Sequence, residues 1–187
     1  MTLLRMEGVS CLRGGRLLFE DMNLALAPGG AAVLSGPNGI GKSSLIRIAA
    51  GLLRAAAGRV ERAGAAALAD EGLALDQRLT LGHALGFWAL LDGGNARAGM
   101  AAMGVAHLGD VPVRMLSTGQ RKRAVLARVA ASGALLWLLD EPANGLDAEG
   151  QERLIEAMAE HRRHGGAILA ASHQPIGLDD AQRIALA

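Results

Sequence analysis

The chain has 187 residues, and its 19 basic residues nearly balance its 18 acidic residues, for a net charge of +1. This length predicts one domain, residues 1–187, with a core of ordinary size. The near-neutral charge argues against nucleic acid as a partner, because nonspecific binding to phosphate backbones needs a basic surface. The single cysteine, Cys11, excludes an internal disulfide and fits a reducing compartment.

No segment predicts a membrane span or a secretion signal. Residues 1–7 lack the apolar core of a signal peptide. The longest apolar run lies near residues 134–139, far short of the ~18–20 residues that cross a bilayer. A membrane role is therefore expected to come through a partner.

The N-terminal segment predicts an antiparallel β portion. Apolar residues fall in strand-like runs on either side of Gly14-Gly15 within residues 3–27. The second run is closed by Pro28-Gly29-Gly30, a strong turn signal.

A phosphate-binding loop follows. The apolar run 31–35 predicts a buried strand, and residues 44–50 have the apolar spacing of a helix that ends at Gly51. Between them stands the spacing G-x-x-x-x-G-K-S of a P-loop. Its residues are Gly36, Pro37, Asn38, Gly39, Ile40, Gly41, Lys42, Ser43 and Ser44.

Each part of this loop suits a triphosphate and its metal. Glycines let backbone N–H groups approach phosphate oxygens, and the start of the helix presents its positive dipole end to them. Lys42 is expected to reach the β- and γ-phosphates, and the Ser43 hydroxyl to bind Mg²⁺. The alternative is a glycine-rich turn with an incidental Lys-Ser pair, which the flanking strand and helix disfavour.

The middle of the chain predicts two short strands and then helices. Strands are expected at residues 58–60 and 65–69. From about residue 79 to residue 132, helical patterns alternate with glycine breaks. We therefore expect a helical subdomain at about 79–132, inserted into an α/β core.

Residues 134–141 form an unbroken apolar run that ends in Asp140 and Glu141. Such a run predicts a strand covered on both faces of a parallel sheet, with the acids emerging beside the P-loop. Asp140 is expected to hold Mg²⁺, and Glu141 to orient the attacking water. The alternative is an Asp-Glu pair that only caps the strand before Pro142.

A helix and one more strand follow. Asp147 is expected to cap the helix, which carries Leu154, Ile155 and Met158 on one side. The run 167–171 predicts the strand, and His173 stands just after it, in the same topological position as the acids. This favours a γ-phosphate contact over a merely structural histidine.

The motif Leu-Ser-Thr-Gly-Gln at 116–120 precedes a basic amphipathic helix at 121–128. With the P-loop, the acids, Asn-Gly-Leu-Asp at 144–147 and the late histidine, this order resembles the ATP-binding cassette family over nearly the whole chain. The resemblance implies an α/β P-loop NTPase fold with an N-terminal antiparallel β portion, an inserted helical subdomain, ATPase activity, and ATP and Mg²⁺ as cofactors. It also implies a dimer of identical subunits, in which the signature of one subunit binds the γ-phosphate held by the other. In this chain the signature residues are Ser117, Gly119 and Gln120.

Two positions depart from the family pattern. Arg13 stands where the family usually has an aromatic residue that stacks on adenine, and a guanidinium plane can also stack on a base. Glu71 falls where the family has a glutamine near the Mg²⁺, and a carboxylate could still bind that metal; Gln77 is the alternative if the loop is rearranged.

Three segments resemble one branch of the family, the ATP-binding subunits of the haem exporter of bacterial cytochrome c maturation: residues 11–19, 161–166 and 172–176. The resemblance implies a peripheral translocase ATPase on the cytoplasmic face of the inner membrane, bound to integral membrane subunits. The alternatives are the ATPase of another exporter, a soluble cassette protein that acts on ribosomes or DNA, and a nucleotide-gated module without catalysis. No residue indicates direct haem contact.

Overall fold

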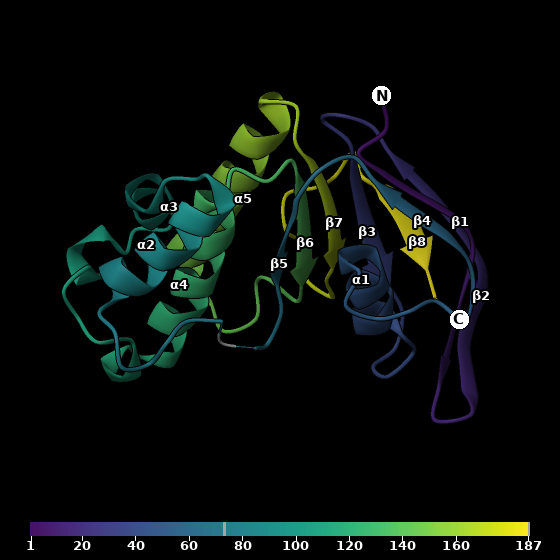
Figure 1. Ribbon diagram of the computed structural model, residues 1–187, viewed down its shortest axis with the longest axis horizontal. Helices are drawn as coiled ribbons and strands as arrows, with labels where there is room; N and C mark the ends of the chain where they lie inside the picture. The colour runs from purple at the N-terminus through teal and green to yellow at the C-terminus, as the bar shows by residue number, and fades with distance from the viewer. Residues whose placement is uncertain (73, 187) are drawn as a thin grey trace.

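The computed structural model describes residues 1–72 and 74–186 (Figure 1). The strands are β1 (Leu4–Arg13), β2 (Arg16–Leu26), β3 (Ala31–Ser35), β4 (Ala57–Arg62), β5 (Ala66–Ala69), β6 (Leu136–Asp140), β7 (Ala167–Ala171) and β8 (Gln182–Ala185). The α-helices are α1 (Lys42–Ala50), α2 (Leu81–Asp92), α3 (Ala96–Ala102), α4 (Thr118–Ala131) and α5 (Ala148–Arg163). Two short 3₁₀ turns, η1 (Ala106–Leu108) and η2 (Val113–Met115), join α3 to α4.

A five-stranded parallel sheet forms the centre, in the order β5-β6-β7-β3-β8. Every residue of β6 and β7 is buried, as expected for strands covered on both faces. The predicted α/β fold class is confirmed. Because the strands run parallel, β3, β6 and β7 end at one edge, and the loops after them meet there.

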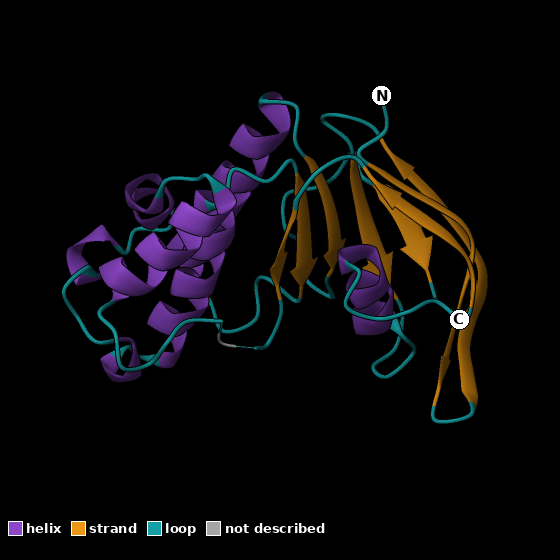
Figure 2. Ribbon diagram, viewed as in Figure 1, coloured by secondary structure: helices purple, strands orange, loops and turns teal. Residues whose placement is uncertain are grey.

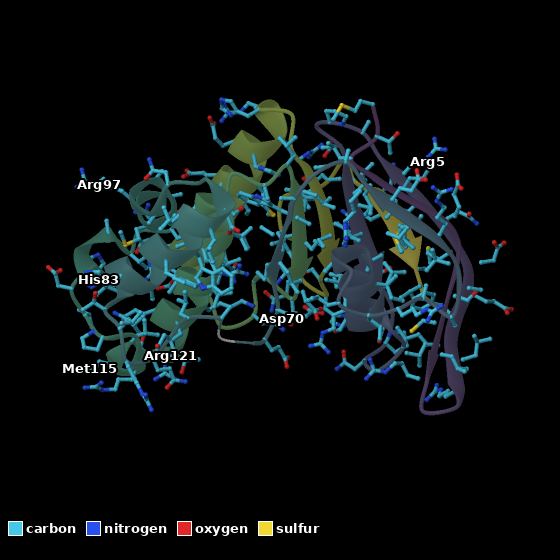
Figure 3. All side chains as sticks on the ribbon, in the orientation of Figure 1. Arg5, Asp70, His83, Arg97, Met115 and Arg121 are labelled. Carbon is cyan, nitrogen blue, oxygen red and sulfur yellow. The ribbon has the colours of Figure 1, made fainter. Side chains whose placement is uncertain are left out.

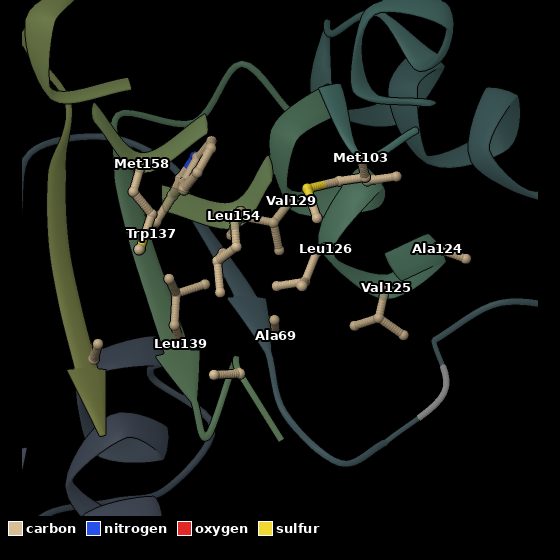
Figure 4. Close-up of a cluster of buried hydrophobic side chains, with 14 of the residues drawn as sticks. Ala69, Met103, Ala124, Val125, Leu126, Val129, Trp137, Leu139, Leu154 and Met158 are labelled. Carbon is tan, nitrogen blue, oxygen red and sulfur yellow. The ribbon is translucent and has the colours of Figure 1, made fainter. Parts of the chain in front are cut away.

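Side chains of the central strands divide between two cores. Trp137 and Leu139 of β6 face α4 and α5, where they pack with Leu126, Leu154 and other side chains (Figure 4). The alternate residues of β6 face the opposite way, toward α1 and the antiparallel strands. This alternation fixes which helix covers each face of the sheet.

The antiparallel strands form a second sheet in the order β2-β1-β4. The β1–β2 hairpin turns at Gly14-Gly15, which confirms the predicted N-terminal antiparallel portion. Helix α1 lies between the two sheets (Figure 2). It ends at Gly51, whose left-handed backbone (φ 77°) gives the predicted C-cap.

Helices α2, α3 and α4 lie together on the opposite side of the molecule from the antiparallel sheet (Figure 1). Trp88 of α2 connects these helices to the loop before α2, because its indole N–H donates a hydrogen bond to the carbonyl of Ala74 at 2.6 Å. The guanidinium of Arg128 on α4 lies over the Trp88 ring, 5.2 Å from its centroid. We propose that residues 79–132 act as a helical subdomain within a single domain.

Two features of the fold differ from the sequence-based expectations. The sequence pattern predicts no strand at β8, although β8 pairs with β3 along the edge of the central sheet. Ile155 does not share the buried side of α5 with Leu154 and Met158; it is 38% exposed and lies against Gly177. Within the described residues, no helix combines the length and the apolar character that crossing a membrane requires.

His161 is a half-buried titratable group on α5, next to β6. Its ring stacks on Trp137, with centroids 4.0 Å and planes 12° apart. Burial lowers the pKa of His161 to about 4, and Nε2 has no hydrogen-bond partner among the described residues. The ring is therefore neutral in the folded protein at physiological pH.

We expect the folded protein to lose stability as the pH falls from about 6.5 toward 4. The unfolded chain binds a proton on His161 in this range and the folded chain does not, so protonation favours unfolding. The expected loss between pH 7 and pH 5 is about 2 kcal/mol, lessened by partial exposure of the ring. Urea unfolding at the two pH values measures it.

His161→Phe preserves the stacked ring and removes the proton site, so much of this pH dependence should disappear. His164→Gln is the matched control, because His164 is exposed and its loss should leave the dependence in place. An unchanged pH dependence in His161→Phe would show that another group is responsible.

Candidate active site

A cavity of about 370 Å³ opens where β3, β6 and β7 end. Residues of the glycine loop, the acidic pair and the late histidine line it together, although they are far apart in the sequence. The lining residues are Leu18, Asn38, Gly39, Gly41, Lys42, Ser43, Ser44, Glu71, Asp140, Glu141, Asn144 and His173. Gly36, Pro37 and Ile40 belong to the loop but do not line this cavity.

The glycine loop leads into α1 without a side-chain cap. The residue before the helix is Gly41, which offers no side-chain acceptor, so the first N–H groups of α1 are left for another partner. Gly41 has φ 120°, and a Cβ there would meet the Phe19 ring at 3.0 Å. At Gly36, with φ 136°, a Cβ would lie 2.5 Å from the carbonyl oxygen of Leu186. The glycines thus allow the loop to pack against the protein as well as to approach a ligand.

Lys42 is held over the loop that precedes it. Its side chain is almost fully buried, at 7% exposure. Nζ donates to the carbonyls of Gly36 at 2.7 Å and Pro37 at 3.0 Å, and it lies 3.0 Å from Nε2 of His173. A fixed ammonium beside the uncapped start of α1 makes the cavity suited to an anion of high charge.

His173 joins the glycine loop to the acidic pair. Its Nε2 lies 3.0 Å from Oδ1 of Asn38 and 3.4 Å from Oε1 of Glu141. The backbone N–H of His173 also faces the other carboxylate oxygen of Glu141, at 3.4 Å. The predicted convergence of these three segments is thus observed in the geometry.

Asp140 and Glu141 emerge at the end of β6. The side chain of Asp140 is buried at 6% exposure. Glu141 has φ 47°, a left-handed backbone that is rare for a residue with a side chain and rarer before a proline. Such a conformation costs about 1–3 kcal/mol and is found where function requires it. It turns the Glu141 carboxylate toward His173.

The segment 116–120 lies apart from this cavity. Ser117 caps α4: its hydroxyl accepts from the N–H of Gln120 at 3.3 Å, and the Gln120 side chain accepts from the N–H of Ser117 at 2.9 Å. Neither Ser117, Gly119 nor Gln120 lines the cavity of the glycine loop. In Figure 3, Arg121, one residue beyond this segment, lies on the helical side of the molecule.

Comparison with known proteins decides the family. The sequence profile of the family described as ABC transporter matches residues 19–144. The chain belongs to the ABC transporter family. It is an ATP-binding cassette with the family's ATPase fold, and the resemblance expected from its motifs is confirmed.

Curated relatives match nearly the whole chain. One is the cytochrome c biogenesis ATP-binding export protein CcmA of Sphingopyxis alaskensis, 54% identical over 98% of this chain and 96% of that protein. The protein of the same name from Novosphingobium aromaticivorans is 57% identical over 95% of this chain and 92% of its own length. A solved ATP-binding subunit of an ABC transporter shares the fold, with a TM-score of 0.88, 22% identity, and coverage of 99% and 86% of the two chains.

The donor set of the cassette fits Mg²⁺. Ser43, Glu71 and Asp140 line one cavity and offer hydroxyl and carboxylate oxygens, which this ion prefers. No group of three or more His, Cys, Asp or Glu side chains among the described residues forms a closed metal cage.

Arg13 and Glu71 differ from the other predicted site residues in which cavities they line. Arg13 does not line the phosphate cavity. It stands opposite Arg16 in the strand register at the tip of the hairpin, and Leu18 of β2 lines the cavity instead. Its stacking on adenine stays a prediction. Glu71 lines both this cavity and a neighbouring one of about 380 Å³, whereas Gln77 lines only the second.

Lys122 contacts the acidic pair, although the sequence around it does not predict this. It lines the neighbouring cavity rather than the phosphate cavity. Its place in a run of basic residues fits a solvated helix face, yet Nζ donates to the backbone carbonyl of Glu141 at 2.9 Å. Burial lowers the pKa of Lys122, and the nearby carboxylates, Asp140 and Glu71 foremost, oppose this shift. Only the contact across the fold distinguishes it from its neighbours.

Proposed function

We propose that this cassette hydrolyses ATP as the peripheral subunit of a membrane complex for cytochrome c biogenesis, most specifically the haem exporter. The names of the relatives that are 54% and 57% identical over nearly the whole chain support this assignment. The complex would place the chain on the cytoplasmic face of the bacterial inner membrane, bound to integral membrane subunits.

The proposed catalytic site uses the residues that meet at the sheet edge. The triphosphate lies on residues 38–44, with Lys42 and the first N–H groups of α1 binding its oxygens. Ser43 and Asp140 would hold Mg²⁺, with Glu71 as a further ligand; the ion would neutralise charge on the phosphates. Glu141 orients and polarises the attacking water, and His173 contacts the γ-phosphate.

The site is proposed to be completed by a second copy of the chain. Ser117, Gly119 and Gln120 stand at the start of α4, away from the chain's own P-loop. The capping box uses the N–H groups of Ser117 and Gln120, so the N–H groups of Thr118 and Gly119 and the Ser117 hydroxyl would form a second anion site. In a head-to-tail homodimer, this segment would bind the γ-phosphate that the other subunit holds.

One observation carries the catalytic part of the proposal: Lys42, His173 and Glu141 form a connected chain of contacts at the wall of one cavity. A strain of Sphingopyxis alaskensis that lacks its own cytochrome c biogenesis ATP-binding export protein provides the test of the cellular role. We expect the wild-type chain to restore c-type cytochromes and the Glu141→Gln variant not to do so. Absence of restoration by a wild-type chain that is expressed at a normal level would contradict the assignment.

A further inference from the structure

The backbone of Glu141 needs support from outside its own strand. Its left-handed conformation, at φ 47° and directly before Pro142, is not one that the local sequence favours. Its N–H is fixed by the carbonyl of Ala171 on β7, at 2.9 Å. Its carbonyl oxygen accepts from Nζ of Lys122 at 2.9 Å and from the N–H of Asn144 at 3.3 Å.

Lys122 comes from a different part of the fold. It lies one turn into α4, the helix that Ser117 caps, and its side chain crosses from the helical group to the end of β6. The charges of Asp140, Glu71, Glu141 and Asp70 act on the ammonium as well and favour its charged form. The contact therefore joins the signature helix of a subunit to the glutamate of that subunit's own site.

We propose that Lys122 is a positioning residue for Glu141: by holding the Glu141 carbonyl, it keeps the carboxylate directed at the attacking water. A rotation of α4 relative to the central sheet would withdraw Nζ and release the peptide. The orientation of the helical group would in this way control hydrolysis within one subunit. This inference rests on the proposed ATPase function.

Lys122→Met removes the donor and the charge while retaining an unbranched side chain of similar length. The full-length variant chain is tagged and purified together with the subunits that bind it. In this complex we expect kcat for ATP hydrolysis to fall about 10-fold. KM should stay within about twofold, because Lys122 does not line the phosphate cavity. Lys122→Arg, which retains a charged donor, should recover most of the loss, and Arg97→Met, an exposed site on α3, should match the wild type.

A second measurement separates positioning from general structural damage. If Lys122 acts through Glu141, Lys122→Met should lower the single-turnover rate no further in a Glu141→Gln background. A further 10-fold loss there, or a wild-type kcat in Lys122→Met alone, would overturn the inference. If Glu141→Gln itself turns over at the wild-type rate, the proposed catalytic role of Glu141 fails instead, whatever Lys122 does.

Discussion

Glu141→Gln is expected to lower the rate of ATP hydrolysis by about 10²- to 10³-fold, because an amide cannot accept the proton of the attacking water. The substitution keeps the size of the side chain and an oxygen that faces the N–H of His173. It also leaves Lys42 and the first turn of α1 untouched, so the affinity for ATP should persist. The variant should therefore accumulate a nucleotide-bound dimer.

Release of phosphate measures turnover, and sedimentation with and without ATP measures the dimer. Glu152→Gln on α5 is a matched control, since Glu152 is exposed and lies outside the cavity. Turnover at the wild-type rate in Glu141→Gln would remove this residue from the chemistry.

Ser117→Asp is expected to abolish both the ATP-dependent dimer and hydrolysis, with a loss of at least about 10²-fold in rate. Aspartate caps a helix as well as serine does, so the start of α4 should remain folded. Its negative charge would, however, face the γ-phosphate that the partner subunit presents. Like charges at such a distance repel strongly when water is excluded.

Ser117→Asn separates charge from capping, because asparagine caps equally well and is neutral. We expect this variant to retain most of the dimer and of the hydrolysis rate. The affinity of the monomer for ATP, measured by equilibrium dialysis, should be the same in both variants. Equal activity of Ser117→Asp and wild type would refute a phosphate contact at this position.

Much of the fold is predictable because burial leaves a clear pattern. The unbroken apolar run of β6 predicts a strand covered on both faces, and all five of its residues are buried. Strand β8 leaves no such pattern: polar residues occupy its first half, and none of its four residues is buried. Its pairing with β3 depends on the edge of the sheet rather than on its own sequence.

Some residues of the candidate site can likewise be predicted from the sequence, and others cannot. Lys42, Asp140 and His173 can be predicted as site residues from the sequence, because each stands in a short motif or directly after a predicted strand. The contact of Lys122 with Glu141 joins two elements through the packing of α4, which no local pattern encodes. The lining of the cavity by Leu18 rather than Arg13 likewise depends on how the β1–β2 hairpin is placed against α1.

The central claim is that two copies of this chain share each ATP. The most direct measurement is a structure of the Glu141→Gln assembly loaded with Mg²⁺ and ATP. The account predicts Ser117 of one subunit at hydrogen-bond distance from the γ-phosphate on the P-loop of the other. Signature segments that face solvent in the nucleotide-loaded assembly would contradict it.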